Sequence, residues 1–302
     1  MLLARLAHKV VRPLSREMVS TGSTGLMAFM GGGEDIVLET YRLIFRGILA
    51  QDLETGNLKL LAPGSRFRVA ALEPRCRWHD GPLDRRDDPL ARTYCLARVS
   101  ENSLGYCRAH RGSLRALYEE CFGGNRGLEA CRKLDEELGD SISYTVYLTV
   151  HSGVRVKVGV TRSFRLLDRL AEQPHDAATI LLETTSAVEA RMAERRISGL
   201  PGFSDKGPRR PGQAGRPNLA LLLDASRRAA SLLGVGWEPR ALRIQAPGTL
   251  GSARSVGALG GGVYTLRNYW GGFLLLEDGS GLVAVRGSRL THRALLLEDR
   301  GV

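Results

Sequence analysis

The fold is decided by residues 143–197, which read SYTVYLTVHSG, VRVKVGV, TRSFRLLDRLAEQP, HDAATILLETT and SAVEARMAERRI. The first two pieces are rich in β-branched and aromatic residues, and the second alternates apolar with polar residues. They are therefore predicted to be two strands joined by a short turn. The third piece has apolar residues at helical spacing behind Thr161 and Ser163, and Pro174 ends it. The fourth is a third strand, and Ser186 caps a second helix in the fifth. The predicted order is ββαβα.

The rest of the chain divides around this block. Its regions, with the block itself, are a mostly β region (1–70), a Cys/His-rich module with short helices (71–142), the ββαβα core (143–200), a basic loop rich in glycine and proline (201–217), and a helix followed by a β-hairpin (218–302). The pattern predicts an α+β protein, in which a small N-terminal β and zinc-binding region and a C-terminal helix and β-hairpin region flank the core.

Charge points to an anionic partner. The 302 residues carry 43 Lys and Arg against 32 Asp and Glu, a net charge of +11, and only five of the basic residues are lysines. Arginine suits phosphate because its planar fork donates two hydrogen bonds at once. No apolar run approaches the ~20 residues that span a bilayer, and no apolar signal core follows the first residues, so we expect a cytoplasmic protein without membrane contact.

Cysteine and histidine spacing predicts a metal site. Cys76 is followed at a two-residue gap by His79, Cys107 by His110 at the same gap, and Cys95 lies between the two pairs. Two ligands on one tight turn reach the same ion, and thiolate with imidazole favours tetrahedral Zn²⁺. We predict a structural zinc held by Cys76, Cys95, Cys107 and His110, with His79 as the alternative for one of them.

The two remaining cysteines have a different setting. Cys121 and Cys131 lie in sequence of helical character and are expected to be core residues. An odd number of cysteines without an export signal favours metal binding in a reducing compartment over disulfides.

The core resembles a known nuclease fold. The order of elements, with Tyr144 and Tyr147 on the first strand and residues 158–161 (VGVT) ending the second, resembles the GIY-YIG nuclease fold. More specifically, about residues 65–290 resemble a poorly characterised prokaryotic family that places a zinc-binding segment before a GIY-YIG-like domain. The matching motifs are KVGVTR (157–162), RLAEQ (169–173) and GVYTL (262–266).

The resemblance implies roles for individual residues. Tyr147 would position or activate the attacking water, and Arg169 on the first helix would stabilise charge on the scissile phosphate. A glutamate on the second helix, Glu194 or alternatively Glu189, would hold a divalent cation, Mg²⁺ or Mn²⁺. Lys157 stands where the second motif of the nucleases has its tyrosine.

These observations predict a nucleic-acid-binding protein with a structural zinc and a GIY-YIG-like core of degenerate nuclease activity. The basic residues expected to contact phosphate are Arg155, Arg162, Arg165, Arg209 and Arg210. One alternative is an active metal-dependent endonuclease of the GIY-YIG type. Another is a protein-interaction adaptor on a ribonucleoprotein.

Overall fold

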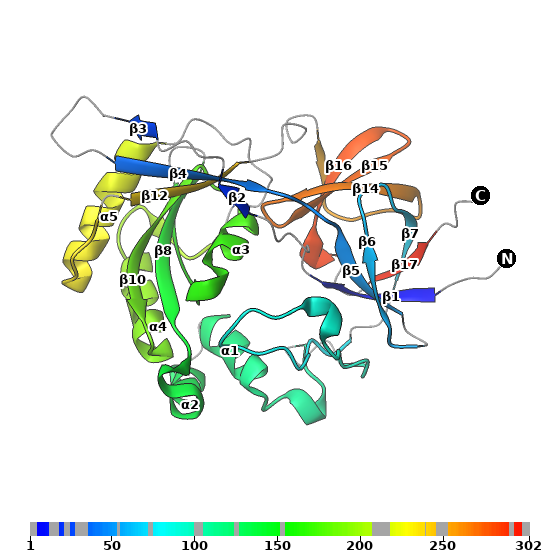
Figure 1. Ribbon diagram of the computed structural model, residues 1–302, viewed down its shortest axis with the longest axis horizontal. Coiled ribbons are helices and arrows are strands. Elements are labelled where there is room, and N and C mark those ends of the chain that lie inside the picture. Colours follow the sequence, from blue (N-terminus) through cyan, green and yellow to red (C-terminus); the bar gives the residue numbers. More distant parts are fainter. Residues whose placement is uncertain are drawn as a thin grey trace.

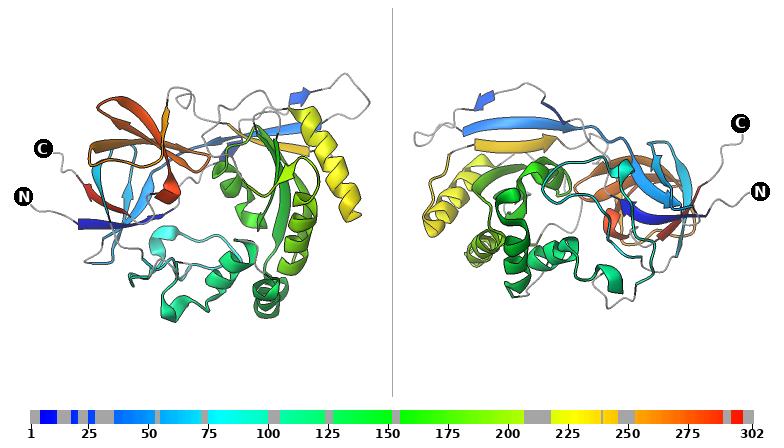
Figure 2. Two further views of the ribbon diagram at one scale, coloured as in Figure 1. Left: turned by 180° about the vertical axis from the view of Figure 1, so that it is seen from behind. Right: turned by 60° about the horizontal axis from the view of Figure 1, so that its bottom comes forward.

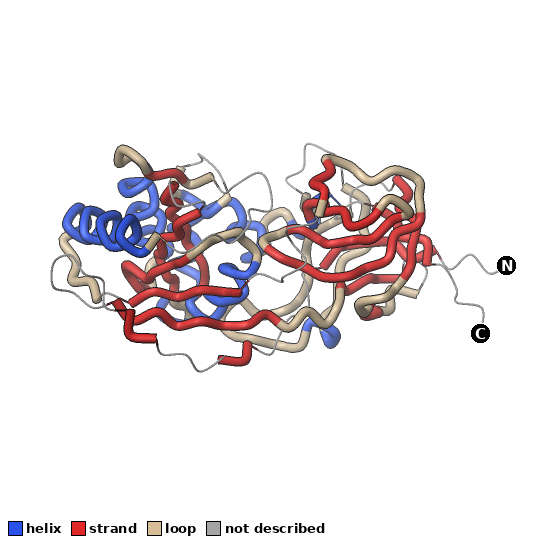
Figure 3. Tube along the Cα trace, turned by 90° about the horizontal axis from the view of Figure 1, so that it is seen from above, coloured by secondary structure: helices blue, strands red, loops and turns tan. Residues whose placement is uncertain are grey.

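The computed structural model is a mixed α+β protein with two large sheets (Figure 1). One sheet carries helices and the other, formed by segments from both ends of the sequence, is a β lobe beside it (Figure 3). The structure describes residues 5–11, 18–20, 25–27, 36–52, 55–71, 75–99, 105–123, 127–151, 155–206, 218–238, 240–245, 253–289 and 293–297. The predicted α+β class is confirmed.

The central block has the predicted order. Its elements are β8 (Tyr144–His151), β9 (Arg155–Arg162), a 3-10 turn leading into α3 (Leu166–Ala171), β10 (Ala177–Thr184) and α4 (Ala187–Ser198). The capping expectation for Ser186 is confirmed, because its hydroxyl accepts a hydrogen bond from the backbone N–H of Glu189 at 3.1 Å. Strand β8 is central, antiparallel to β9 on one side and to β10 on the other.

This sheet is larger than the three predicted strands. Its order is β11-β9-β8-β10-β12-β4-β2, and β3 also pairs with β4. The added strands are β2 (Met18–Ser20), β3 (Gly25–Met27), β4 (Ile36–Leu43), β11 (Phe203–Ser204) and β12 (Arg240–Gln245). Strand β11 falls within the predicted loop 201–217, so the start of that loop is an edge strand parallel to β9. Residues 207–217 of the loop lie outside the described residues.

The two faces of this sheet have separate cores. Even-numbered residues of β8, such as Val146 and Leu148, are buried with residues of α4 and of α5 (Leu219–Leu233). Asn218 caps α5 as predicted, its side-chain oxygen accepting from the N–H of Leu221 at 3.0 Å. On the opposite face, Tyr147 belongs to a cluster that includes α3 and Trp270 of the β lobe. The second core therefore joins the two sheets.

The β lobe joins the two ends of the chain in one nine-stranded sheet of order β13-β16-β15-β14-β7-β17-β1-β5-β6. Its members are β1 (Arg5–Val11), β5 (Ile48–Asp52), β6 (Leu58–Leu61), β7 (Arg66–Ala71), β13 (Arg254–Val256), β14 (Val263–Trp270), β15 (Phe273–Asp278), β16 (Gly281–Arg286) and β17 (Arg293–Leu297). The predicted C-terminal hairpin is β15–β16. Regions that the sequence separates, 1–70 and 218–302, thus share a sheet.

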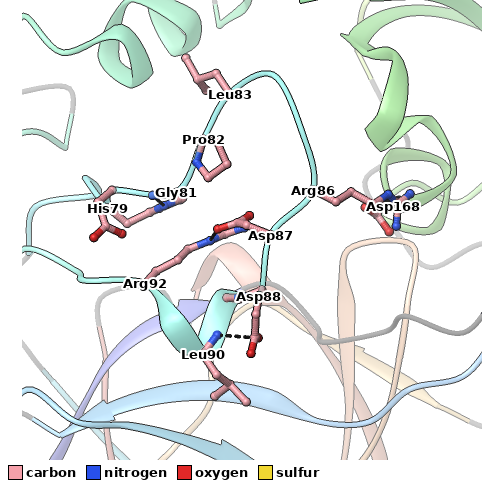
Figure 4. Close-up of polar contacts among 12 residues, drawn as sticks. His79, Gly81, Pro82, Leu83, Arg86, Asp87, Asp88, Leu90, Arg92 and Asp168 are labelled. Carbon is pink, nitrogen blue, oxygen red and sulfur yellow. Dashed lines mark hydrogen bonds and ion pairs between the residues drawn. The ribbon is translucent and has the colours of Figure 1, made fainter.

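The Cys/His-rich segment lies below and between the two sheets (Figure 2). It ends in α1 (Leu114–Phe122) and α2 (Glu129–Leu138), the two short helices expected there. Its loop is fastened to α3 and the preceding turn: Arg86 donates to the carbonyl oxygen of Phe164 at 2.7 Å and lies 3.8 Å from Asp168 (Figure 4). Within the loop, Arg92 pairs with Asp87, and the Asp88 carboxylate accepts from the N–H of Leu90 at 2.9 Å.

Candidate functional site

A cavity of about 680 Å³ separates the Cys/His-rich segment from the central sheet. All four candidate residues of the core, Tyr147, Lys157, Arg169 and Glu194, line it. They come from β8, β9, α3 and α4, so the fold brings together side chains that are up to 47 positions apart. We call this cavity the cleft.

The floor of the cleft depends on a glycine. Tyr147 pairs with Gly159 in the register of β8 and β9, and Lys157 is on the same face two residues earlier. A Cβ on Gly159 would lie 2.7 Å from the Tyr147 hydroxyl oxygen and 3.1 Å from Lys157 Nζ. Both polar groups therefore occupy the space over the Cα atom of Gly159. Burial raises the pKa of Tyr147, so its hydroxyl stays protonated.

Arg169 is held in a polar network beside Tyr147. Its guanidinium lies 3.0 Å from the carboxylate of Glu172, whose other oxygen is 2.8 Å from Arg165. With the Gln173 amide oriented to satisfy both neighbours, its oxygen accepts from the Tyr147 hydroxyl at 3.1 Å and from Arg169 Nε at 3.0 Å. This network fixes the direction of the arginine while leaving 42% of its side chain exposed.

The second helix presents one of its two candidate glutamates to the cleft. Glu194 is 8% exposed and pairs with Arg191 one turn earlier, and burial raises the pKa of its carboxyl group. Glu189 is exposed on the first turn of α4, where it bonds the Thr184 hydroxyl, and it is not among the lining residues. A divalent cation on Glu194 would have to compete with the Arg191 guanidinium, so the side chains present fit a resident cation poorly.

The charged side chains that line the cleft are of both signs. Its described lining holds five basic and five acidic side chains: Arg77, Arg111, Lys157, Arg165 and Arg169 against Glu119, Glu120, Glu172, Glu194 and Asp205. Three of the carboxylates are neutralised by arginine partners, in the Glu119–Arg77, Glu172–Arg169 and Glu194–Arg191 pairs.

Arg77 and Arg111 were not among the residues predicted from sequence. Each directly follows a predicted metal ligand, Cys76 or His110, and lines the wall of the cleft opposite Lys157 and Arg169. Their adjacency to ligands was visible in the sequence, but nothing there showed that the segment would fold over the core.

The predicted phosphate-contacting arginines have different positions. Arg165 lines the cleft, and Arg155 is exposed at the start of β9. Arg162 is only 3% exposed; its guanidinium donates to the carbonyl oxygen of Leu83 at 2.9 Å and lies 5.0 Å from the Tyr118 ring centroid. The assignment of Arg162 to phosphate contact is therefore wrong, because the side chain fastens the Cys/His-rich segment to β9. Arg209 and Arg210 lie outside the described residues.

The four predicted zinc ligands form one group. The ligand atoms of Cys76, Cys95, Cys107 and His110 all lie within 4.8 Å of one another. The Cys95–Cys107 Sγ separation is 4.0 Å, and His110 Nδ1 is 3.6 Å from Cys76 Sγ and 3.3 Å from Cys107 Sγ. Tetrahedral Zn²⁺ with bonds of ~2.3 Å to sulfur and ~2.0 Å to nitrogen requires S–S and S–N separations of about 3.8 and 3.5 Å. The group could bind a metal ion of this kind.

Contacts around this group order its ligands. The His110 ring stacks on Trp78 with centroids 4.1 Å apart, and the Cys107 N–H donates to Cys76 Sγ at 3.4 Å. His79, the alternative ligand, is outside the group: its Nδ1 accepts from the N–H of Gly81 at 3.2 Å, and its ring lies 5.0 Å from that of Tyr94.

The other two cysteines form a disulfide, which the sequence did not predict. Cys121 on α1 and Cys131 on α2 are buried, as expected, and are bonded to each other with their Cα atoms 4.9 Å apart. The expectation that the cysteines form no disulfide is wrong for this pair, because a short connection packs the two helices side by side; Cys76, Cys95 and Cys107 are free thiols.

Comparisons with protein-family models, with curated proteins and with solved structures found no match. Among the described residues, no helix has the length and apolar character needed to cross a membrane.

Proposed function

We propose that the cleft binds the phosphodiester backbone of a nucleic acid. The observation that carries this proposal is the convergence of Tyr147, Lys157 and Arg169 on one cavity, opposite Arg77 and Arg111. Hydrogen-bond donors on two facing walls suit a polyanion threaded between them, and a net charge of +11 would accelerate its approach. The wall that carries Arg77 and Arg111 is held by the Cys3His group, for which we propose Zn²⁺.

We also infer that the core is GIY-YIG-like. Support comes from the ββαβα order and from the common cavity of Tyr147, Arg169 and Glu194, the residues to which the resemblance assigns roles. Lys157 in place of a tyrosine and the Arg191–Glu194 pair favour binding over cation-dependent cleavage.

Fluorescence anisotropy with labelled single- and double-stranded DNA and RNA oligomers tests binding. We expect affinity to fall steeply between about 50 and 200 mM salt, because each phosphate contact releases counterions. Arg111→Met removes a phosphate contact of the cleft wall, whereas Arg132→Met removes a charge on the exposed side of α2, outside the cleft. Affinity should drop several-fold, roughly 3- to 10-fold, in the first variant and stay within twofold in the second. Binding that ignores salt, or equal losses in both variants, would overturn the proposal.

Cleavage is the second candidate, favoured by the placement of Tyr147, Arg169 and Glu194 in one cavity. Incubation of nucleic acid with the protein and Mg²⁺ or Mn²⁺, beside a Glu194→Gln variant, tests it. Cleavage that requires the added cation and is lost in the variant would establish it. Equal cleavage by both proteins would indicate a contaminant.

A further inference from the structure

Lys157 has an environment unlike that of the other lysines with described side chains. Its Nζ donates to the carbonyl oxygen of Val158 at 3.2 Å and lies 5.9 Å from the Tyr147 ring centroid. Among the described residues, it has no carboxylate within ion-pair distance, whereas Lys133 pairs with Glu129 and both Lys59 and Lys206 are exposed to solvent. The amine is partly buried in the cleft, with Glu194 and Asp205 in the same lining but beyond ion-pair distance.

Enclosure changes the protonation of this amine. Burial disfavours the ammonium form, and the positive charge of Arg169 in the same cavity disfavours it further. Together they lower the pKa of Lys157 to about 8, although Glu194 and Asp205 act in the opposite direction. Roughly a tenth of the lysine is then an uncharged amine at pH 7, several hundred times the fraction for an ordinary lysine.

An uncharged amine in a cavity is a nucleophile for carbonyl carbon. The amine and the protonated Tyr147 hydroxyl lie together over Gly159, and both side chains line the cleft, where the hydroxyl can donate to a carbonyl oxygen beside the amine. The arginines in the lining of the same cavity suit a carbonyl compound that carries phosphate. Within a nucleic acid, the group that combines both is the ring-opened deoxyribose of an abasic site, an aldehyde flanked by phosphodiesters.

We propose that Lys157 forms an imine with the aldehyde of abasic sites and that the cleft acts as a β-lyase on them. This inference rests on the proposed nucleic-acid binding and adds a substrate class and a reaction to it.

The reaction balances without an oxidant or a metal ion. The Nζ lone pair attacks C1′, the carbonyl oxygen takes up a proton, and loss of one water gives the imine. A proton leaves C2′ to water, and the C3′–O bond breaks, so that the 3′ phosphate departs with the bonding pair. One water then hydrolyses the imine, which restores the Lys157 amine and releases a strand ending in an unsaturated aldehyde.

Borohydride trapping tests the imine directly. The full-length protein is incubated with a duplex containing one abasic site, without added divalent cation, and sodium borohydride reduces any imine to a stable cross-link. We expect a cross-linked band and strand cleavage with the wild-type protein and with Lys206→Arg. We expect neither with Lys157→Arg, which keeps the positive charge but lacks a nucleophilic amine. Cross-linking by Lys157→Arg at the wild-type level would overturn the proposal.

Two measurements separate this inference from the proposed binding. The first is affinity for a duplex with a tetrahydrofuran abasic analogue, which has no aldehyde; it should be equal, within about threefold, in wild type and Lys206→Arg, because Lys206 is exposed and does not line the cleft. If wild type binds this duplex but traps no abasic site, the lyase inference fails and the binding proposal survives.

The second measurement uses glycolaldehyde phosphate with borohydride, followed by peptide mapping. Modification of Lys157 ahead of Lys59 and Lys206 is expected whether or not nucleic acid binds. If Lys157 is modified and no oligomer binds, the binding proposal fails and with it the assignment of abasic sites as substrate. Modification spread evenly over the lysines contradicts a reactive amine at Lys157.

Discussion

Tyr147 and Gly159 are cross-strand partners, and the tyrosine hydroxyl fills the space where any other residue would place its Cβ. The pair positions the floor of the cleft, because Lys157 packs over the same glycine and Gln173 links the hydroxyl to Arg169. The absence of a Cβ at Gly159 thus leaves room for the arrangement of three candidate side chains, Tyr147, Lys157 and Arg169.

Substitution of Gly159 by alanine should destabilise the protein. The new Cβ would meet the Tyr147 ring and hydroxyl at 2.7 Å, and overpacking of a buried site costs about 1–3 kcal/mol. Chemical denaturation measures the loss. Gly236→Ala is the matched control, since its Cβ would meet nothing within 4 Å. Equal stability of the two variants would contradict the close packing.

Metal content should distinguish the two candidate histidines. We expect one equivalent of zinc per chain in wild type and in His79→Asn, and strongly reduced zinc in His110→Asn, because only His110 is in the Cys3His group. Elemental analysis after gel filtration measures the ratio. Loss of zinc in the His79 variant with retention in the His110 variant would reverse the ligand assignment.

Stability should fall as the pH decreases from 6.5 toward 4. His175 is buried, its Nδ1 lies 2.9 Å from the carbonyl oxygen of Gln173, and its Nε2 accepts from the N–H of Ile244 at 3.3 Å. Burial lowers the pKa of His175 to about 4, so the unfolded chain takes up a proton in this range that the folded chain refuses.

The His175 contribution is fully present above pH 6.5 and is lost as the pH falls toward 4, a change of about 2–3 kcal/mol between pH 7 and 4.5. Urea denaturation at both pH values, in wild type and in His175→Asn, isolates it from the titration of carboxylates. Identical pH slopes for the two proteins would contradict it.

Reduction of the Cys121–Cys131 bond should lower stability by about 2–3 kcal/mol, because the bond closes a loop of about ten residues in the unfolded chain. Thermal unfolding with and without a reductant measures the effect in wild type. A double variant with serine at both positions should show no response to the reductant. Alkylation of the denatured, zinc-free protein before reduction should label three of the five cysteines; five labelled thiols would show that the bond is absent.

Local sequence patterns were enough to predict much of the secondary structure, as the caps at Ser186 and Asn218 show. The spacing of cysteines and histidines also predicted the Cys3His group that could bind a metal ion, and the structure places the alternative, His79, outside it. Arg162 was misassigned because a buried arginine bonded to a backbone carbonyl has the same local sequence signal as an exposed one. The pairing of distant segments, such as β4 with β12, could not be predicted, because the periodicity of a strand does not identify its partner.

Strand β17 lies between β1 and β7, so a segment that begins at residue 293 separates two segments that precede residue 72. On the ribosome, the early strands emerge long before their neighbour exists, whereas β8, β9 and β10 are made consecutively and have only short loops to close. Synthesis therefore leaves β1 and β7 each with an open edge until residues 293–297 have been made. A nascent chain that stalls before residue 293 would have an assembled central sheet beside an incomplete β lobe. The unpaired edges of β1 and β7 would make that lobe prone to aggregation and a target for chaperones.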